Sequence, residues 1–233
     1  MLNSIVERSR LISPLNATEK KIIRSAAKLF LQNGFSSTTL KMISADCGLL
    51  QGTIAYHFHT KEDMLYLLIQ ELMDFHSKLV ATTEDETGDK LLAFATEVTA
   101  QISICEADSK AWDLYHAAYS LPGTLELIKD WTSRKNYRTF HERLPGWTER
   151  DFRIKENIAS GIEFSALTSP CHADHTLEDK ISSVLDSLFL LYKIPKEERE
   201  RVIGKILELD YRNLGQELLG QFANRLKQSA EDA

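Results

Sequence analysis

The chain has 233 residues, 43% of them hydrophobic and 27% charged, which is enough for one large or two small domains with cores of their own. No apolar run approaches the roughly 18 residues of a membrane-spanning helix, and the first residues lack the apolar segment of an export signal. Three cysteines, Cys47, Cys105 and Cys171, do not make a disulfide framework, so the composition predicts a cytoplasmic protein and excludes the membrane and disulfide-rich secreted classes.

Charge is distributed unevenly along the chain, whose formal net charge is −6. Residues 1–70 hold eight basic and five acidic residues, a net charge of +3, which leaves −9 for the rest. A basic N-terminal unit on an acidic body suggests that only this unit approaches a polyanion. A charge difference of this size also arises by chance, so by itself it is weak evidence for binding to a polyanion.

Apolar residues recur at helical spacing along almost the whole chain. In the N-terminal part this spacing predicts helices over 18–33, 39–46 and 50–57. A fourth helix is expected over 60–82, capped by Thr60 with Asp63 in the capping-box position. The polar run TTEDETGD over 82–89 is the best candidate for a loop or domain linker.

Seven further helices are expected after this run. Their predicted ranges are 89–106, 109–120, 123–142, 149–168, 177–192, 196–212 and a last one from 215. Prolines and glycines mark the breaks between them, and the pairs Thr148 with Asp151 and Thr176 with Asp179 have the spacing of helix start signals. The sequence therefore predicts an all-α protein.

Residues 38–58 predict two short helices joined by a tight turn at Gly48, with a longer helix on each side. This is the helix-turn-helix pattern, whose second helix enters the major groove of DNA. The apolar residues of the stretch are expected to face inward; they are Leu40, Ile43, Cys47, Leu49, Ile54 and Phe58.

The outward face of the second helix is expected to carry the DNA contacts. Gln51, Gly52 and Thr53 open this helix, and glutamine can pair with adenine while threonine can bond a base edge or touch a thymine methyl group. At the far end, Tyr56, His57 and Lys61 are placed for phosphate contacts that fix the register on DNA.

The segment KKIIRSAAKLFLQNGFSSTTLKMISADCGLLQGTIAYHFHTKEDML, residues 20–65, resembles the N-terminal DNA-binding domain of the tetracycline-repressor (TetR) family. The matching features are Ala26-Ala27 with Leu29-Phe30, Gly34-Phe35, Thr38-Thr39, Ile43, Gly48, Gly52-Thr53, Phe58 and Lys61-Glu62. Elsewhere the resemblance is only architectural. The segment differs from the family pattern at Leu50, where a small polar cap is usual, and at Ala55, where a tyrosine is usual.

This resemblance implies a homodimeric transcription regulator, usually a repressor, that a small molecule releases from a palindromic double-stranded DNA operator. It carries the family's DNA contacts over to Thr39, Lys41, Gln51, Gly52, Thr53, Tyr56, His57 and Lys61. It also divides the chain into an N-terminal arm over 1–17, a helix-turn-helix domain over 18–62, and a helical ligand-binding and dimerisation domain over 63–233.

Aromatic residues gather in the middle helices, where they can build either a core or a ligand pocket. The candidate ligand residues are Trp112, Tyr115, Tyr119, Trp131 and Phe164. An apolar or aromatic effector is expected, and the acidic body favours a neutral or cationic molecule over an anion.

Helix 177–192 is apolar on nearly all sides in its C-terminal half, so it needs cover from two directions. One cover is expected to be a second subunit, packed also on helix 149–168, whose face contains small residues. The candidate dimer residues are Ile154, Ile158, Ile162, Ile181 and Leu188. The alternative is a central helix that is fully buried in a monomer.

The run PCHADH over 170–175 brings Cys171, His172, Asp174 and His175 close together. Adjacent Cys and His side chains do not easily face one ion, and no well-spaced fourth ligand is present, so a polar loop is favoured and no metal or cofactor is expected. The motifs of phosphate-binding loops, nucleophile elbows and zinc proteases are also missing. We therefore expect a regulator rather than an enzyme; the alternative is a helical small-molecule-binding protein or enzyme with a non-functional DNA-binding head.

Overall fold

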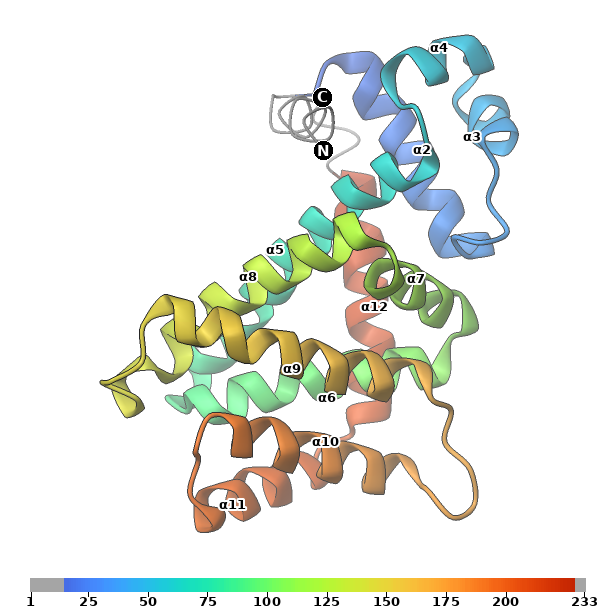
Figure 1. The fold of residues 1–233 in the computed structure, drawn as a ribbon. Helices are drawn as coiled ribbons and strands as arrows, with labels where there is room; N and C mark the ends of the chain where they lie inside the picture. The colour runs from blue at the N-terminus through green and yellow to red at the C-terminus, as the bar shows by residue number, and fades with distance from the viewer. Residues whose placement is uncertain (1–14, 229–233) are drawn as a thin grey trace.

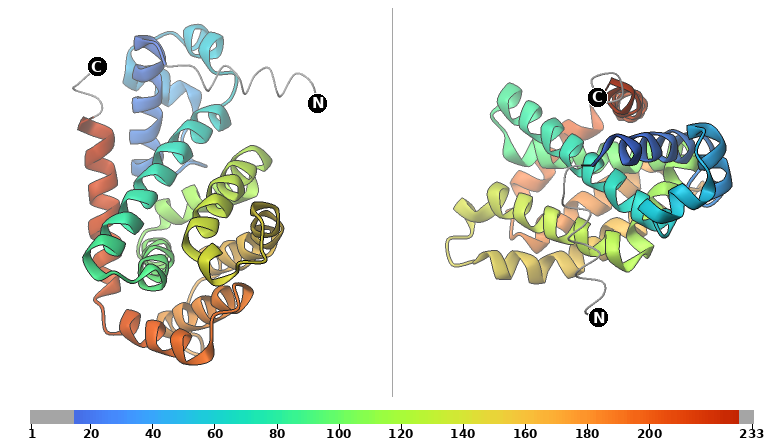
Figure 2. Two further views of the ribbon diagram at one scale, coloured as in Figure 1. Left: turned by 90° about the vertical axis from the view of Figure 1, so that its left-hand side faces the viewer. Right: turned by 90° about the horizontal axis from the view of Figure 1, so that it is seen from above.

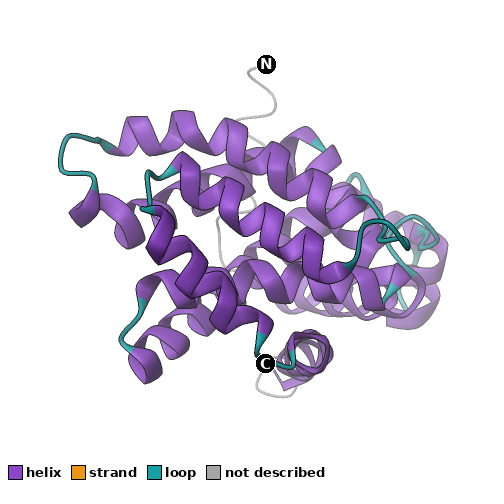
Figure 3. Cartoon of the chain, turned by 90° about the horizontal axis from the view of Figure 1, so that it is seen from below, coloured by secondary structure: helices purple, strands orange, loops and turns teal. Residues whose placement is uncertain are grey.

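A computed structural model describes residues 15–228, and this part of the chain is built of helices joined by short loops (Figure 3). The helices are α2 (Ala17–Asn33), α3 (Leu40–Cys47), α4 (Gln51–His57), α5 (Lys61–Thr87), α6 (Lys90–Ala107), α7 (Ser109–Ser120), α8 (Pro122–Phe140), the short 3-10 helix η1 (His141–Arg143), α9 (Glu149–Thr168), α10 (Leu177–Leu191), α11 (Lys196–Leu207) and α12 (Tyr211–Gln228). The all-α prediction is confirmed. Within these residues, no helix is both long and apolar enough to cross a membrane.

Helices α2, α3 and α4 form a small head, and α5 to α12 form a larger body (Figure 1). Helix α5 runs from the head into the body, where α6, α8 and α9 lie side by side above α10 and α11. Helix α12 then returns from the bottom of the body towards the head, packing along α6 and reaching α2 (Figure 2). The body therefore meets the head through α5, α7 and α12.

Local sequence sets where several helices begin. The predicted capping boxes at Thr60 and Asp63, Thr148 and Asp151, and Thr176 and Asp179 are all present, at the starts of α5, α9 and α10. In each box the threonine oxygen accepts a hydrogen bond from the backbone N–H three residues later, and the aspartate accepts one from the threonine N–H. A further box, Asn16 with Glu19, opens α2.

The loop predicted over 82–89 is wrong, because α5 continues through it to Thr87. The Thr83 and Thr87 hydroxyls donate to the carbonyls of Leu79 and Thr83 at 3.0 and 2.6 Å, so these polar residues stay inside the helix. Gly88, at φ 64°, ends the helix in the left-handed region that favours glycine. Polar composition here reflects exposure to solvent rather than a helix end, and the expected domain boundary at 62/63 falls in the first turn of a continuous α5.

The helix predicted over 196–212 is also interrupted. Helix α11 ends at Leu207 and α12 begins at Tyr211. The Asp210 carboxylate accepts a hydrogen bond from the Asn213 N–H at 3.2 Å, which starts a new helix at a point where the apolar period alone shows no break.

The two dimer residues predicted on α10 are covered by the same chain. Ile181 and Leu188 are both 0% exposed, because α9, α6 and α11 of the same chain pack around α10. The expectation that these two side chains contact a second copy is therefore corrected. Ile154 and Ile158 of α9 remain 47% and 51% exposed, so an apolar strip of α9 is open to a partner.

Candidate nucleic-acid interface

The helix-turn-helix has the interior that its sequence predicts. Ile43 and Ile54 are fully buried and Cys47 and Phe58 are nearly so, while Leu40 and Leu49 are half-buried against them. Gly48, at φ 63°, allows the tight turn between α3 and α4. The Ser44 hydroxyl closes this turn by donating to the Leu49 carbonyl at 2.5 Å.

The outward face of α4 is accessible and carries no acid. Gln51, Gly52 and Ala55 are exposed, Thr53 is half-buried, and Tyr56 is 77% exposed. Residues 48–60 contain no aspartate or glutamate, so no carboxylate on this helix repels a phosphate backbone.

Leu50 is a feature of this face that sequence reasoning treated only as a departure from a family pattern. Its side chain is 80% exposed and gives α4 no hydrogen-bonded cap. An exposed leucine at this position presents an apolar surface beside the first turn of α4. The sequence already indicated this feature, because a leucine at the N-cap position cannot accept a hydrogen bond from the first turn of the helix.

Helix α3 offers two more of the predicted residues. Thr39 caps α3 by accepting from the Met42 N–H at 3.2 Å and is exposed, and Lys41 is exposed in the first turn of α3. The acidic residue of this helix, Asp46, is paired with α2. Its carboxylate accepts from Lys28 Nζ at 2.6 Å and from the Ser25 hydroxyl at 2.7 Å. These bonds hold the pKa of Asp46 below its ordinary value, and they tie α3 to α2.

Lys61 points into the head. Its Nζ donates to the carbonyls of Phe35, Thr38 and Ser36 at 2.8, 3.2 and 3.4 Å, and it lies 4.2 Å from the centre of the Phe35 ring. The ammonium group thereby holds the loop between α2 and α3 against the start of α5. A phosphate contact by Lys61 requires the side chain to leave these carbonyls.

His57 is likewise engaged inside the head. Its Nδ1 lies 3.2 Å from the Glu19 carboxylate, whose other oxygen accepts from the Asn16 N–H in the capping box of α2. His57 thus joins α4 to α2. The structure places six of the eight predicted DNA residues with accessible groups on α3 and α4, and it uses Lys61 and His57 for contacts within the head.

The five aromatic residues predicted to bind a ligand make contacts with other residues of the body. Trp112 donates to the Thr168 carbonyl at 3.1 Å, Trp131 donates to the Ser77 hydroxyl at 2.9 Å, and Phe164 stacks on Tyr119 at 6.3 Å between ring centres. Tyr115 lines a small cavity of about 20 Å³ between α5, α6, α7 and α12. Trp112, Tyr119 and Phe164 lie together between α7 and α9, since the His116 ring is 5.1 Å from Trp112 and 5.8 Å from Phe164. Trp131 lies apart from them on α8.

Tyr115 and Tyr119 instead direct their hydroxyls to buried polar groups in the body. The Tyr115 hydroxyl lies 3.2 Å from His76 Nε2, and the Tyr119 hydroxyl donates to Glu163 at 2.9 Å. Burial lowers the pKa of His76 to about 4, although Glu97 is 3.6 Å away. The histidine is therefore neutral at physiological pH.

Three glutamates of this region, Glu97, Glu156 and Glu163, are buried. Lys135 pairs with Glu97. Burial raises the pKa of Glu163 to about 6, and burial together with the charge of Glu163 raises the pKa of Glu156 well above its ordinary value. One oxygen of Glu156 accepts from Asn136 at 3.3 Å and the other has no protein partner. The body interior is therefore acidic and poor in compensating cations.

Residues 169–176 form the loop between α9 and α10. His172 and His175 pair through their main chains at 3.0 Å, and the Cys171 N–H donates to the Glu106 carboxylate at 3.1 Å. Across residues 15–228, no group of three or more His, Cys, Asp or Glu side chains is arranged to hold a metal ion.

Comparison with known proteins identifies the head. Residues 22–66 match the family model described as "Bacterial regulatory proteins, tetR family". The head of this chain therefore matches the DNA-binding domain of the TetR family. This match covers α3 and α4 completely, together with most of α2 and the start of α5.

Curated relatives resemble the head of this chain. HTH-type transcriptional regulator UidR of Escherichia coli (strain K12) is 35% identical over 80 residues, which is 34% of this chain and 40% of UidR. HTH-type transcriptional repressor KstR2 of Mycobacterium tuberculosis (strain ATCC 25618 / H37Rv) is 27% identical over 82 residues, which is 35% of this chain and 41% of KstR2. The chain thus spans about two-fifths of the length of these relatives.

One solved structure resembles this chain over most of its length. The crystal structure of the multidrug binding protein EbrR complexed with imidazole has a TM-score of 0.51 at 18% identity, and the match covers 80% of this chain and 99% of that one. The shared fold therefore extends from the head into the body.

Proposed function

We propose that the chain is a dimeric DNA-binding transcriptional repressor that reads a palindromic operator with α4. The observation that carries this proposal is the accessible, acid-free face of α4, held by the buried contacts of Ile43 and Ile54 with the rest of the head. In the TetR family, to which this head belongs, the corresponding helix is a DNA-reading element.

Each accessible residue has a chemical role in this proposal. Gln51 and Thr53 contact base edges in the major groove, and Gly52, which lacks a side chain, allows the backbone to approach. Thr39, Lys41 and Tyr56 contact phosphates, which fix the register of the helix without reading sequence.

A dimer follows from the need for two heads on a palindrome. The α9 strip with Ile154 and Ile158 supplies exposed apolar surface for it. Beside this strip, a groove of about 550 Å³ runs between α9 and α10, lined by Ile158, Gly161 and Ile162 on one side and by Ser183, Val184 and Ser187 on the other. Small residues along this groove permit close approach of a helix from a second copy. Ile181 and Leu188 have no part in this interface.

The effector is proposed to be a neutral or cationic apolar molecule that acts in the body. Buried Glu163, whose nearby cation Lys135 is already paired with Glu97, favours a cation over an anion there. Tyr115 and Tyr119 border the same buried polar region, since their hydroxyls bind His76 and Glu163. Such a molecule releases the operator only to the extent that it binds the released conformation more tightly.

Retardation of DNA tests the proposal. The full chain is titrated onto DNA from upstream of its own gene, in parallel with random DNA of equal length. We expect retardation at nanomolar protein, a symmetric footprint with half-sites about one helical turn or a simple multiple apart, and loss of affinity at higher salt. Equal affinity for random DNA, with no footprint, would contradict the proposal and favour a small-molecule-binding protein with a non-functional head.

A further inference from the structure

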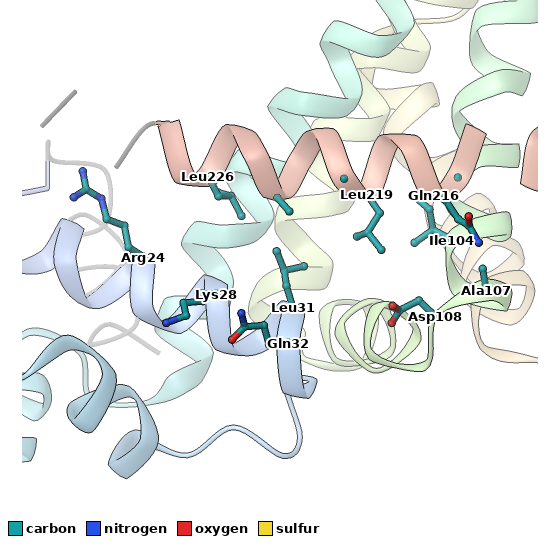
Figure 4. A pocket seen from close by; sticks show the side chains of 13 residues that line it. Arg24, Lys28, Leu31, Gln32, Ile104, Ala107, Asp108, Gln216, Leu219 and Leu226 are labelled. Atoms are coloured by element: carbon teal, nitrogen blue, oxygen red, sulfur yellow. The ribbon is translucent and has the colours of Figure 1, made fainter. Parts of the chain in front are cut away.

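A groove separates the head from the C-terminal helix (Figure 4). It measures about 700 Å³, within the roughly 300–1,000 Å³ range of sites for small molecules. One wall is α2 of the head, the opposite wall is α12, and the end of α6 closes one end. We call it the α2–α12 groove; its lining is Arg24, Lys28, Leu31, Gln32, Ile104, Ala107, Asp108, Gly215, Gln216, Leu219, Gly220, Ala223 and Leu226.

The wall formed by α12 is anchored to the body on both sides of the groove. At Gly215 an added Cβ would lie 3.1 Å from the Ile104 N, so α12 packs directly on α6 there. Further along α12, Arg225 pairs with Asp74 of α5 at 2.5 Å. At Gly220, between these anchors, an added Cβ meets nothing within 4 Å, because this glycine faces the open groove.

The interior of the groove is apolar and one end of its rim is basic. Leu31 points from α2 towards Leu219 of α12 across the gap in Figure 4. Arg24 and Lys28 stand one turn apart on α2 at the head end, and the Lys28 side chain remains 53% exposed although it pairs with Asp46. The acid at the other end, Asp108, accepts from the N–H groups at the start of α7, so its charge is already compensated.

We propose that the α2–α12 groove binds an amphiphile with a single apolar chain and an anionic head group, and that its occupancy changes the affinity for DNA. The chain lies along Leu31, Leu219 and Leu226, and the anion lies at Arg24 and Lys28. This site is distinct from the acidic body interior, which favours cations. The effect on DNA rests on the proposed function, whereas binding to the groove does not.

The position of the groove gives a reason for this coupling. A molecule inside it touches α2, which belongs to the head, and α12, which is fixed to the body. The head meets the body at a second point, where the Ser36 N–H donates to the Asp113 carboxylate of α7 at 2.7 Å. A bound chain therefore favours one distance between α2 and α12, and a head held at that distance presents α4 differently from a free one.

Calorimetric binding to the full chain tests the site without DNA. Decanoate is the probe, with decyltrimethylammonium and 1-decanol as chain-matched comparisons, and with hexanoate and octanoate as shorter anions. We expect decanoate to bind more tightly than both comparisons, and affinity to rise by about fourfold for each added CH₂. Gly220→Trp should abolish binding, since its side chain fills the groove. Gly204→Trp on α11, where an added Cβ also meets nothing within 4 Å, should leave binding unchanged.

Binding of decanoate that survives Gly220→Trp, or no binding of decanoate, would overturn the site. Tighter binding of the ammonium probe would overturn the anionic assignment. Operator retardation with and without decanoate then tests the coupling, with an expected change of at least about fivefold in DNA affinity. Unchanged DNA affinity at saturating decanoate would refute the coupling alone. A chain that binds no DNA at all contradicts the proposed function, and the calorimetry still decides the site.

Discussion

Replacing Lys61 with alanine separates a structural role from a DNA contact. In the structure, the Lys61 ammonium donates to three carbonyls of the loop between α2 and α3 and lies over the Phe35 ring. Hydrogen bonds to a charged group are worth about 1.5–3 kcal/mol and an exposed cation–π contact about 0.5–1 kcal/mol. The freed carbonyls can bind water, so we expect Lys61→Ala to lower the free energy of unfolding by about 2 kcal/mol.

The assays are thermal unfolding and the salt dependence of DNA binding. For a chain of this size, a loss of about 2 kcal/mol lowers the melting temperature by about 4–8 °C. If Lys61 touches no phosphate, the slope of log affinity against log salt stays the same in Lys61→Ala. Lys61→Met keeps the apolar stem and loses the ammonium group, so it should show most of the same destabilisation.

Lys41→Ala is the matched control, since Lys41 is exposed on α3 and is proposed to contact phosphate. It should change stability by less than about 0.5 kcal/mol and make the salt slope of the dimer shallower by about 1.8, which is about 0.9 for each head. The opposite pattern for Lys61→Ala, with unchanged stability and a slope shallower by about 1.8 for the dimer, would refute the structural role and restore the phosphate contact.

Three other predictions follow from the proposed sites. Gln51→Ala and Thr53→Ala should each weaken operator binding by about 1–3 kcal/mol and leave binding to random DNA nearly intact, as measured by competition titration; equal losses on both DNAs would remove α4 from base recognition. Gly161→Trp, which has space in one chain but projects into the α9–α10 groove, should shift sedimentation equilibrium towards monomer, while Gly204→Trp should not. Between pH 4.5 and 6 native Glu163 keeps a proton that the unfolded chain has lost, so wild-type stability falls as pH rises through this range, and Glu163→Gln should gain up to about 2 kcal/mol over wild type there in urea unfolding.

Helix positions could be predicted from the sequence because they depend on neighbouring residues. Thr148 and Asp151 satisfy each other three residues apart whatever the rest of the chain does. The interior of the helix-turn-helix was predictable for the same reason, since Ile43 and Ile54 follow from helical period and one glycine turn. The same local reasoning misread residues 82–89, because a polar run and an exposed helix end have the same composition.

Side-chain partners that are distant in sequence could not be predicted. Lys61 binds carbonyls more than twenty residues earlier in the chain, and nothing in its local sequence distinguishes these from phosphate oxygens. Ile181 and Leu188 were assigned to a dimer because their helix is apolar on many sides, but the number of helices in the same chain decides what covers them. The α2–α12 groove was also beyond prediction, since it depends on α12 turning back to the head.

These distant partners form one connection between body and head. Helix α7 carries Tyr115 and Tyr119, whose hydroxyls enter the buried polar region, and it also carries Asp113, which binds Ser36 in the head loop. Gly34 is needed beside this contact, because its φ is +86° and an added Cβ would lie 2.7 Å from the Asp113 carboxylate. Lys61 fixes the same loop to the first turn of α5. An effector that moves α7 therefore acts on the loop that Lys61 holds, and the loop acts on the start of α5 beside α4. Loss of the Lys61 contacts should for this reason weaken the response to an effector as well as the stability of the head.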